Sequence, residues 1–229
     1  MKTLTKYLFI SITVLFIHSE VRAQSDWNFG LNGGLNLAWV SASVVTGDPL
    51  PGDFGKRLSY NVGLFAEYGF NERLYFQIGL NLDQRGFKYK ESNPDKFVDI
   101  TIKASYLEVP LLFRYAFIMD ESFKIYILAG PSFAYLAGGR IKGEKTYKGV
   151  SYDINDKITD SYNSTDLGIK VGIGAEIPFA DDMGATFFDV RYYYGFTDNI
   201  RQSGYYETSN VDANSQVLSF VVGVRGYLE

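Results

Sequence analysis

Histidine and cysteine, the side chains that most often carry nucleophilic or metal chemistry, are almost missing from this chain of 229 residues. There is no cysteine, and the one histidine is His18, near the N-terminus. A Ser-His or Cys-His nucleophilic pair and a His-ligated metal site therefore cannot be built from the residues after it. The sequence predicts no enzyme that depends on these groups, and we expect no catalytic residues.

The oxygen-bearing residues that come closest to a cation site are Asp153, Asn155, Asp156 and Asp160. Their spacing resembles that of a calcium-binding loop, but Ile158 stands where such a loop needs glycine, and no bidentate glutamate follows. Glycine patterns that bind phosphate or dinucleotides do not occur either. We therefore expect no metal site and no cofactor.

Ten charged residues follow a different pattern, because each stands on the polar side of a segment whose other side is apolar. They are Glu67, Asp83, Arg85, Glu108, Arg114, Lys170, Glu176, Asp189, Arg191 and Arg225. Five of them are acids and five are bases, so each charge can find a partner. Because an unpaired buried ion costs several kcal/mol, we interpret the set as a structural network of ion pairs. A proton or ion path along the same side chains is the alternative.

Apolar and polar residues alternate with a period of two after residue 28, which is the pattern of β-strands whose two faces meet different surroundings. From Arg73 to Arg85, for example, leucine, phenylalanine and isoleucine fill one side, while tyrosine, glycine and polar residues fill the other. No segment has a sustained helical period. Eight segments show the alternation: about 28–40, 57–70, 73–88, 101–117, 123–137, 165–179, 184–196 and 215–228.

The connections between these segments alternate in length. Three are short, at 71–72, 118–122 and 180–183, and four are long, at about 41–56, 89–100, 138–164 and 197–214. Outer-membrane barrels have this asymmetry, with short periplasmic turns and long external loops. We therefore predict an all-β fold: an eight-stranded antiparallel transmembrane β-barrel, up-and-down and closed, with long extracellular loops.

In such a barrel the apolar face meets lipid and the polar face lines the interior, which is the reverse of a soluble barrel. Eight strands enclose only enough room for side chains, so we expect the ten charges to plug the interior. Aromatic residues support this orientation, because they gather near both ends of the predicted strands. Examples are Tyr68 and Phe113 at one end and Trp39 and Tyr192 at the other.

Three prolines interrupt the predicted strands: Pro110, Pro131 and Pro178. Each of them removes one N–H donor from the ladder of backbone hydrogen bonds. We therefore expect a β-bulge or a strand end at each proline.

The N-terminus has the features of a secretory signal peptide. Lys2 and Lys6 precede an apolar run of ten residues, 8–17, and Val21-Arg22-Ala23 supplies a cleavage site after Ala23. A membrane-spanning helix would need about 20 apolar residues. We therefore divide the chain into a signal peptide, residues 1–23, and one outer-membrane β-barrel domain, residues 24–229. We expect export to the bacterial outer membrane.

The net charge of the chain and the tyrosines in its long connections indicate which kinds of partner it can bind. The formal charge is −4, and residues 1–23 carry three bases and one acid, so the remainder is near −6 and argues against nucleic acid as a partner. Tyrosines in the long connections suit protein or glycan binding, or simply cover the barrel mouth. They are Tyr89, Tyr147, Tyr152, Tyr162, Tyr205 and Tyr206. We expect outer-membrane lipid around the barrel and envelope or secretion-machinery proteins at the loops.

The run Tyr106-Leu-Glu-Val-Pro-Leu-Leu-Phe-Arg-Tyr115 resembles a characteristic strand of the PorT-like outer-membrane β-barrel family, which is common in Bacteroidetes. The segments 29–36, 130–131 and 191–195 resemble other parts of that family. The resemblance implies an outer-membrane location and an eight-stranded barrel, and it carries no catalytic motif. The founding member of the family is associated with type IX secretion and gliding, which suggests a role in protein secretion. The C-terminus departs from the usual barrel pattern, because it ends in Glu229 rather than an aromatic residue.

Three functions fit the sequence. The first, which we prefer, is a non-enzymatic integral outer-membrane barrel with a plugged polar interior, acting as a structural or interaction protein of the envelope. The second is a small, porin-like transport or ion-conducting barrel. The third is a secreted soluble barrel that binds an apolar ligand, and extraction into buffer without detergent would distinguish it from the other two.

Overall fold

The computed structural model describes residues 27–44, 52–94, 96–120, 122–158, 163–179, 183–198 and 211–227. The expected signal peptide, residues 1–23, and its cleavage site after Ala23 lie outside the described residues. Nearly all of the described residues belong to β-strands, which confirms the all-β class predicted from the alternation. Within this part of the chain, no helix has the length and apolar character needed to cross a membrane.

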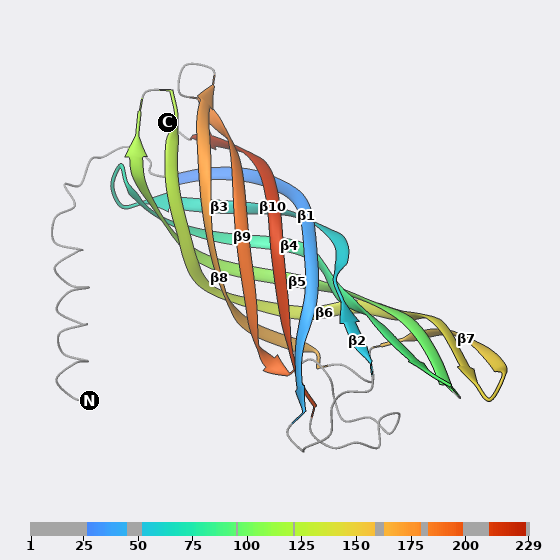
Figure 1. The fold of residues 1–229 in the computed structure, drawn as a ribbon. Coiled ribbons are helices and arrows are strands. Elements are labelled where there is room, and N and C mark those ends of the chain that lie inside the picture. Colours follow the sequence, from blue (N-terminus) through green and yellow to red (C-terminus); the bar gives the residue numbers. More distant parts are fainter. Residues whose placement is uncertain are drawn as a thin grey trace, which may run out of the picture.

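Eight antiparallel strands form a ring in the order β4-β3-β1-β10-β9-β8-β6-β5, and β5 pairs with β4 to close it (Figure 1). The ring strands are β1 (Trp27–Val44), β3 (Arg57–Gly69), β4 (Leu74–Asn93), β5 (Lys96–Met119), β6 (Lys124–Tyr147), β8 (Thr165–Phe179), β9 (Gly184–Asp198) and β10 (Val211–Tyr227). Two shorter strands lie outside the ring. Of these, β2 (Asp53–Gly55) pairs with β4, and β7 (Val150–Lys157) pairs with β6. All eight predicted segments are therefore strands, and each pairs with the next along the chain.

The ring turns its apolar side outward and its charged side inward. On β8 the exposed fraction alternates along the strand, so that Ile173 is 51% exposed while Glu176 is 1% exposed. Leu31 on β1 and Leu64 on β3 are also exposed, at 61% and 54%. Leaving apolar surface in water is unfavourable by about 25 cal/mol per Å², and large exposed apolar surfaces mark contact with another apolar phase. The outer surface of the ring therefore suits lipid better than water.

Two of the long connections predicted from the sequence are wrong, because their residues continue the strands. Residues 89–100 were expected to form a loop, but β4 runs to Asn93 and β5 begins at Lys96, with Lys90 opposite Asp99. Residues 138–164 were also expected to form a loop, but β6 continues to Tyr147, turns at Lys148 and Gly149, and returns as β7. Both turn residues have positive φ, 49° and 80°, as a two-residue hairpin turn of type I′ requires.

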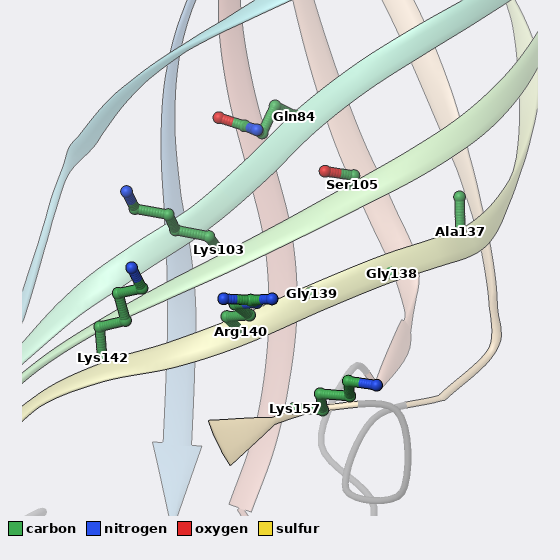
Figure 2. Close-up of a pocket in the computed structure, with 9 residues that line it drawn as sticks. All are labelled: Gln84, Lys103, Ser105, Ala137, Gly138, Gly139, Arg140, Lys142 and Lys157. Atoms are coloured by element: carbon green, nitrogen blue, oxygen red, sulfur yellow. The ribbon is translucent and has the colours of Figure 1, made fainter. Parts of the chain in front are cut away.

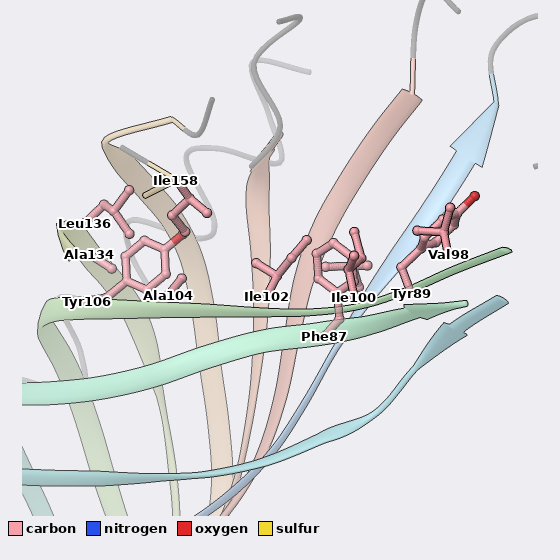
Figure 3. Packing of buried hydrophobic residues seen from close by; sticks show 11 residues of the cluster. Phe87, Tyr89, Val98, Ile100, Ile102, Ala104, Tyr106, Ala134, Leu136 and Ile158 are labelled. Atoms are coloured by element: carbon pink, nitrogen blue, oxygen red, sulfur yellow. The ribbon is translucent and has the colours of Figure 1, made fainter. Parts of the chain in front are cut away.

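The extended parts of β4, β5 and β6, with β2 and β7 at their sides, project beyond the ring (Figure 1). We call them the projecting sheet. One face of this sheet and the adjoining mouth of the ring carry a continuous apolar cluster (Figure 3). Its members are Val40, Phe87, Tyr89, Val98, Ile100, Ile102, Ala104, Tyr106, Ala134, Leu136 and Ile158. The expectation of a polar inner face therefore holds only in part deep in the ring, where the charged residues share the interior with apolar groups such as Leu112, Leu128 and Val221. It is wrong at this end, where burial of apolar groups holds the hairpins together.

The prolines do not produce the bulges expected at two of the three positions. Register shifts lie between Ser105 and Tyr106 and between Ala116 and Ile118, not at Pro110 or Pro131. Instead, the β4–β5 ladder skips Val109 and Pro110, and the β5–β6 ladder skips the pairs at Gly130 and Pro131, without a change of register. A missing N–H removes one hydrogen bond from one ladder, and the intact flanking pairs keep the strands aligned. The third proline, Pro178, stands one residue before the end of β8, as expected.

Candidate functional site

All ten charged residues that the alternation selected are buried in the interior of the ring. They come from six strands: Glu67 on β3, Asp83 and Arg85 on β4, Glu108 and Arg114 on β5, Lys170 and Glu176 on β8, Asp189 and Arg191 on β9, and Arg225 on β10. The period-two pattern of each strand places them inward, because side chains two residues apart share a face. They gather into two clusters and one separate pair.

The first cluster lies toward the short turns and contains Glu67, Arg114, Glu176 and Arg225; we call it the turn-side cluster. Arg114 donates from Nε and one terminal nitrogen to the two oxygens of Glu67, at 2.9 and 2.8 Å, and from its other terminal nitrogen to Glu176 at 3.1 Å. Arg225 contacts Glu176 and lies 3.4 Å from Glu67. Two acids and two bases therefore form a closed square across the ring, in which each ion has two partners of opposite charge within the cluster, and Lys124 lies 3.8 Å from Glu176.

Aromatic and polar side chains surround the turn-side cluster. The guanidinium of Arg114 lies 4.1 Å from the centre of the Tyr75 ring, and that of Arg225 lies 5.6 and 5.4 Å from the ring centres of Phe65 and Phe187. Tyr227 donates its hydroxyl to Glu176 at 3.0 Å, and Asn28 donates to Glu67 at 3.3 Å. Guanidinium groups are attracted to ring faces, so these contacts add to the ion pairs and fix their geometry.

The second cluster lies toward the mouth of the ring and contains Asp83, Arg85, Glu108, Asp166 and Lys170; we call it the mouth-side cluster. Arg85 is its centre, because its three nitrogens reach Asp83, Glu108 and Asp166 at 2.8 Å each. Lys170 binds the second oxygen of Glu108 at 2.7 Å. The ring of Tyr193 lies 4.0 Å from the Arg85 guanidinium.

The remaining pair, Asp189 and Arg191, is joined at 2.5 Å, and Tyr126 donates its hydroxyl to Asp189 at 2.5 Å. This arrangement depends on Gly174 of the neighbouring strand, since a Cβ there would lie 2.0 Å from the Asp189 carboxylate. Arg191 borders a cavity of about 10 Å³ that also touches residues of the mouth-side cluster. That volume is about the size of one water molecule.

Three buried charged residues were missed by the sequence analysis. Asp166 lies on the inward face given by the alternation of β8, but it stands at the start of the strand and was not included among the ten charged residues. Arg57 donates to the Arg85 carbonyl at 3.0 Å and to Gln84 at 2.8 Å, and Glu91 lies in a segment that was expected to be a loop. With Asp166, the mouth-side cluster contains three acids and two bases. The balance of five and five inferred from the sequence therefore does not describe the whole interior.

The structure also places the weaker candidates. Asp153, Asn155 and Asp156 lie on β7, where the alternation of a strand directs Asp153 and Asp156 to opposite faces. Asp160 lies outside the described residues, and among those described no acidic, histidine or cysteine groups come together as a metal site would require. Of the tyrosines in the long connections, Tyr89 is buried in the apolar cluster, while Tyr147 and Tyr152 are exposed. The other three, Tyr162, Tyr205 and Tyr206, lie outside the described residues.

Comparison with solved structures finds the same fold in outer membrane proteins. OprG from Pseudomonas aeruginosa is 12% identical, with a TM-score of 0.50, and the match covers 91% of this chain and 100% of that one. Neisserial surface protein A is 16% identical, with a TM-score of 0.41 and coverage of 87% and 97%. One enzyme is also among the similar structures: the outer membrane protease OmpT from Escherichia coli, at 9% identity, a TM-score of 0.48 and coverage of 92% and 99%. Identities this low show likeness of fold alone.

The family comparison is more direct. A model of the outer membrane protein beta-barrel domain matches residues 22–201 of this chain, whereas no curated protein matches it. The family points to the bacterial outer membrane. Assignment to the PorT-like group stays a prediction from the Tyr106–Tyr115 run. The match spans most of the eight-stranded ring, and the chain therefore belongs to the outer membrane protein beta-barrel domain family.

Proposed function

We propose that this chain spans the outer membrane as a non-enzymatic, non-conducting barrel and acts as a structural or interaction protein of the envelope. The observation that carries the proposal is the inverted arrangement of side chains in the ring. Apolar residues such as Ile173 and Leu64 face outward, while thirteen charged residues in the described part of the chain are buried. A soluble barrel that held an apolar ligand would need the opposite arrangement, so this observation argues against the soluble alternative.

Aromatic pairs on the outer surface support the membrane orientation. Near the short turns, Trp27 packs on Tyr68 with ring centres 5.3 Å apart, and Phe76 packs on Phe113 at 5.2 Å. Toward the long connections, Trp39 packs on Tyr192 at 6.2 Å. Amphipathic rings favour the two interfaces of a bilayer, so such pairs at both ends suit a spanning segment between them.

The ion clusters support a closed interior. Arg114 on β5 joins β3 and β8, and Arg85 on β4 joins β5 and β8, so the side chains cross the interior from wall to wall. Eight strands leave little space beyond what such side chains fill. A continuous water path would require these charged groups to separate, which is costly in a low-dielectric interior. A structural plug is therefore favoured over the transport or ion-conducting alternative.

The projecting sheet supports a role in interaction. Its strand β7 is paired with β6 in the described residues, and nearly all of its side chains are exposed. An open strand edge offers unpaired N–H and C=O groups to which a partner can add a strand. The PorT-like resemblance of the Tyr106–Tyr115 run makes protein secretion the envelope process that we favour, with a secretion-machinery protein as the partner.

Membrane insertion can be tested by refolding residues 24–229 in phosphatidylcholine vesicles. We expect the vesicle-bound protein to migrate as a compact band when unheated and as a slower band after boiling, because a closed ladder of backbone hydrogen bonds resists detergent. We also expect it to float with the vesicles in a density gradient at high salt. A chain that stays in the aqueous fraction without detergent would overturn the proposal in favour of the soluble alternative.

Conduction provides a separate test of the plugged interior. With the refolded protein in a planar bilayer, we expect no steady single-channel conductance, because the turn-side and mouth-side clusters fill the ring. The matched comparison is the variant Arg85→Ala/Arg114→Ala, which shortens the two side chains that span the interior. Steady conductance by the unaltered protein would favour the transport alternative instead.

A further inference from the structure

Five exposed basic residues lie together on the outward face of the projecting sheet, the face opposite its apolar cluster. We call them the cationic patch; they are Lys88, Lys103, Arg140, Lys142 and Lys157. Lys103, Arg140 and Lys157 are direct neighbours on β5, β6 and β7, since the register pairs Lys103 with Arg140 and Arg140 with Lys157. Figure 2 shows four of the five around one hollow.

This arrangement is unfavourable for the sheet by itself. Like charges directly opposite each other on neighbouring strands destabilise their pairing. The described residues supply no ion pair to the three central cations, although the second row beyond them on the same face does contain one, between Lys90 and Asp99 at 2.8 Å. The sheet therefore forms an ion pair where an acidic side chain is close, and it leaves the basic side chains of the patch unpaired among the described residues. An anion from outside would relieve the repulsion.

The patch begins where the apolar outer surface of the ring ends. Along the outward face of β5, exposed Leu107 is followed by Ser105 and then by Lys103. At about 3.3 Å per residue, four residues span roughly 13 Å along a tilted strand. The polar region of a bilayer begins immediately beyond its hydrocarbon core. The cations therefore stand at the depth of lipid headgroups, on the side of the long connections.

A hollow of about 520 Å³ lies at the centre of the patch. Lys103, Arg140, Lys142 and Lys157 line it together with the uncharged polar groups of Gln84 and Ser105, and its lining contains no acid. A register shift between Ser105 and Tyr106 leaves Ala137 of β6 without a partner on β5, and Gly138 leaves open space where a side chain would stand. Arginine binds phosphate oxygens with two parallel N–H groups, and amide and hydroxyl groups suit sugar hydroxyls.

We propose that the cationic patch binds the phosphorylated sugar headgroup of a glycolipid in the outer leaflet. The inference rests on the proposed function, because the patch meets lipid only if the ring spans the membrane with its long connections outside. Arg140 and Lys103 would hold a phosphate group, while Gln84 and Ser105 contact the sugar. The lipid then neutralises the repulsion within the patch and anchors the projecting sheet to the membrane surface.

The test measures lipid binding by the refolded protein in zwitterionic detergent, with native mass spectrometry to count bound lipid. The probes are bisphosphorylated lipid A, its dephosphorylated form, and inorganic phosphate. We expect the bisphosphorylated lipid to bind at least tenfold more tightly than the dephosphorylated one. The variant Lys103→Gln/Arg140→Gln should lose about tenfold in affinity for it, whereas Lys145→Gln/Lys148→Gln, which removes the same charge from the tip of the projecting sheet, should bind normally.

Equal affinity of the two variants, or equal binding of the two lipids, would overturn the inference. Inorganic phosphate that binds as tightly as the lipid would overturn the assignment to a glycolipid in favour of a free anion. These results apply to protein that shows the compact band of a folded barrel and floats with vesicles. A chain that fails to insert would overturn the proposed function, and this inference with it.

Discussion

Replacing Arg114 with leucine should lower the free energy of unfolding by about 3–5 kcal/mol, because it leaves two buried carboxylates with too few cations. The guanidinium group of Arg114 donates two hydrogen bonds to Glu67 and a third to Glu176. Without it, Arg225 alone of the turn-side cluster must serve both acids, with only the more distant Lys124 at 3.8 Å from Glu176, and both carboxylates are buried. Urea unfolding of the refolded protein, followed by tryptophan fluorescence, measures the loss.

The matched control for this result is Arg73→Leu, which removes an arginine from an exposed turn. It should change stability by less than about 0.5 kcal/mol. A second variant, Arg114→Leu/Glu67→Gln, removes one charge of each sign from the turn-side cluster and should recover part of the lost stability. If Arg114→Leu were as stable as the unaltered protein, the turn-side cluster would have no role in holding the ring.

The alternation in the sequence was enough to predict the eight strands and which way their side chains face. Successive side chains of a strand point to opposite faces, whatever the orientation of the strand in the ring. Glu176 and Ile173 could therefore be assigned to opposite sides without coordinates. The partners of each ion could not be predicted in this way. Arg114 meets Glu176 across 62 residues of sequence, and that contact depends on the tilt and stagger of the strands, which a single sequence does not specify.

The projecting sheet was missed for a different physical reason. Its residues still alternate, with Phe87 and Tyr89 on one side and Lys88 and Lys90 on the other, but residues 89–100 were assigned to a connection although lysines and acids take the place of apolar residues on the outer side. Strands that leave the membrane no longer need an apolar outer face, so their composition changes while their period does not. The cationic patch lies on this outer face, and for that reason it was also missed.

Replacing Ile173 with arginine should lower the stability of the vesicle-inserted protein by about 2–4 kcal/mol, the cost of a cation facing lipid near the middle of the membrane. Ile173 lies near the centre of β8, pairs with Ile127 and Val190, and points outward with half of its surface exposed. In water, an arginine at such an exposed position would cost almost nothing. The loss of stability in this variant therefore shows whether lipid or water surrounds the ring. It is measured by urea unfolding of the vesicle-inserted protein.

The control is Tyr152→Arg on β7, which has a similar exposure, 58%, but lies on the projecting sheet outside the ring. We expect this variant to unfold at nearly the same urea concentration as the unaltered protein. A large cost at Ile173 with little cost at Tyr152 would locate the lipid boundary between the two positions. Equal and small costs at both would mean that water surrounds the ring, and the charges buried inside it would then need a different explanation.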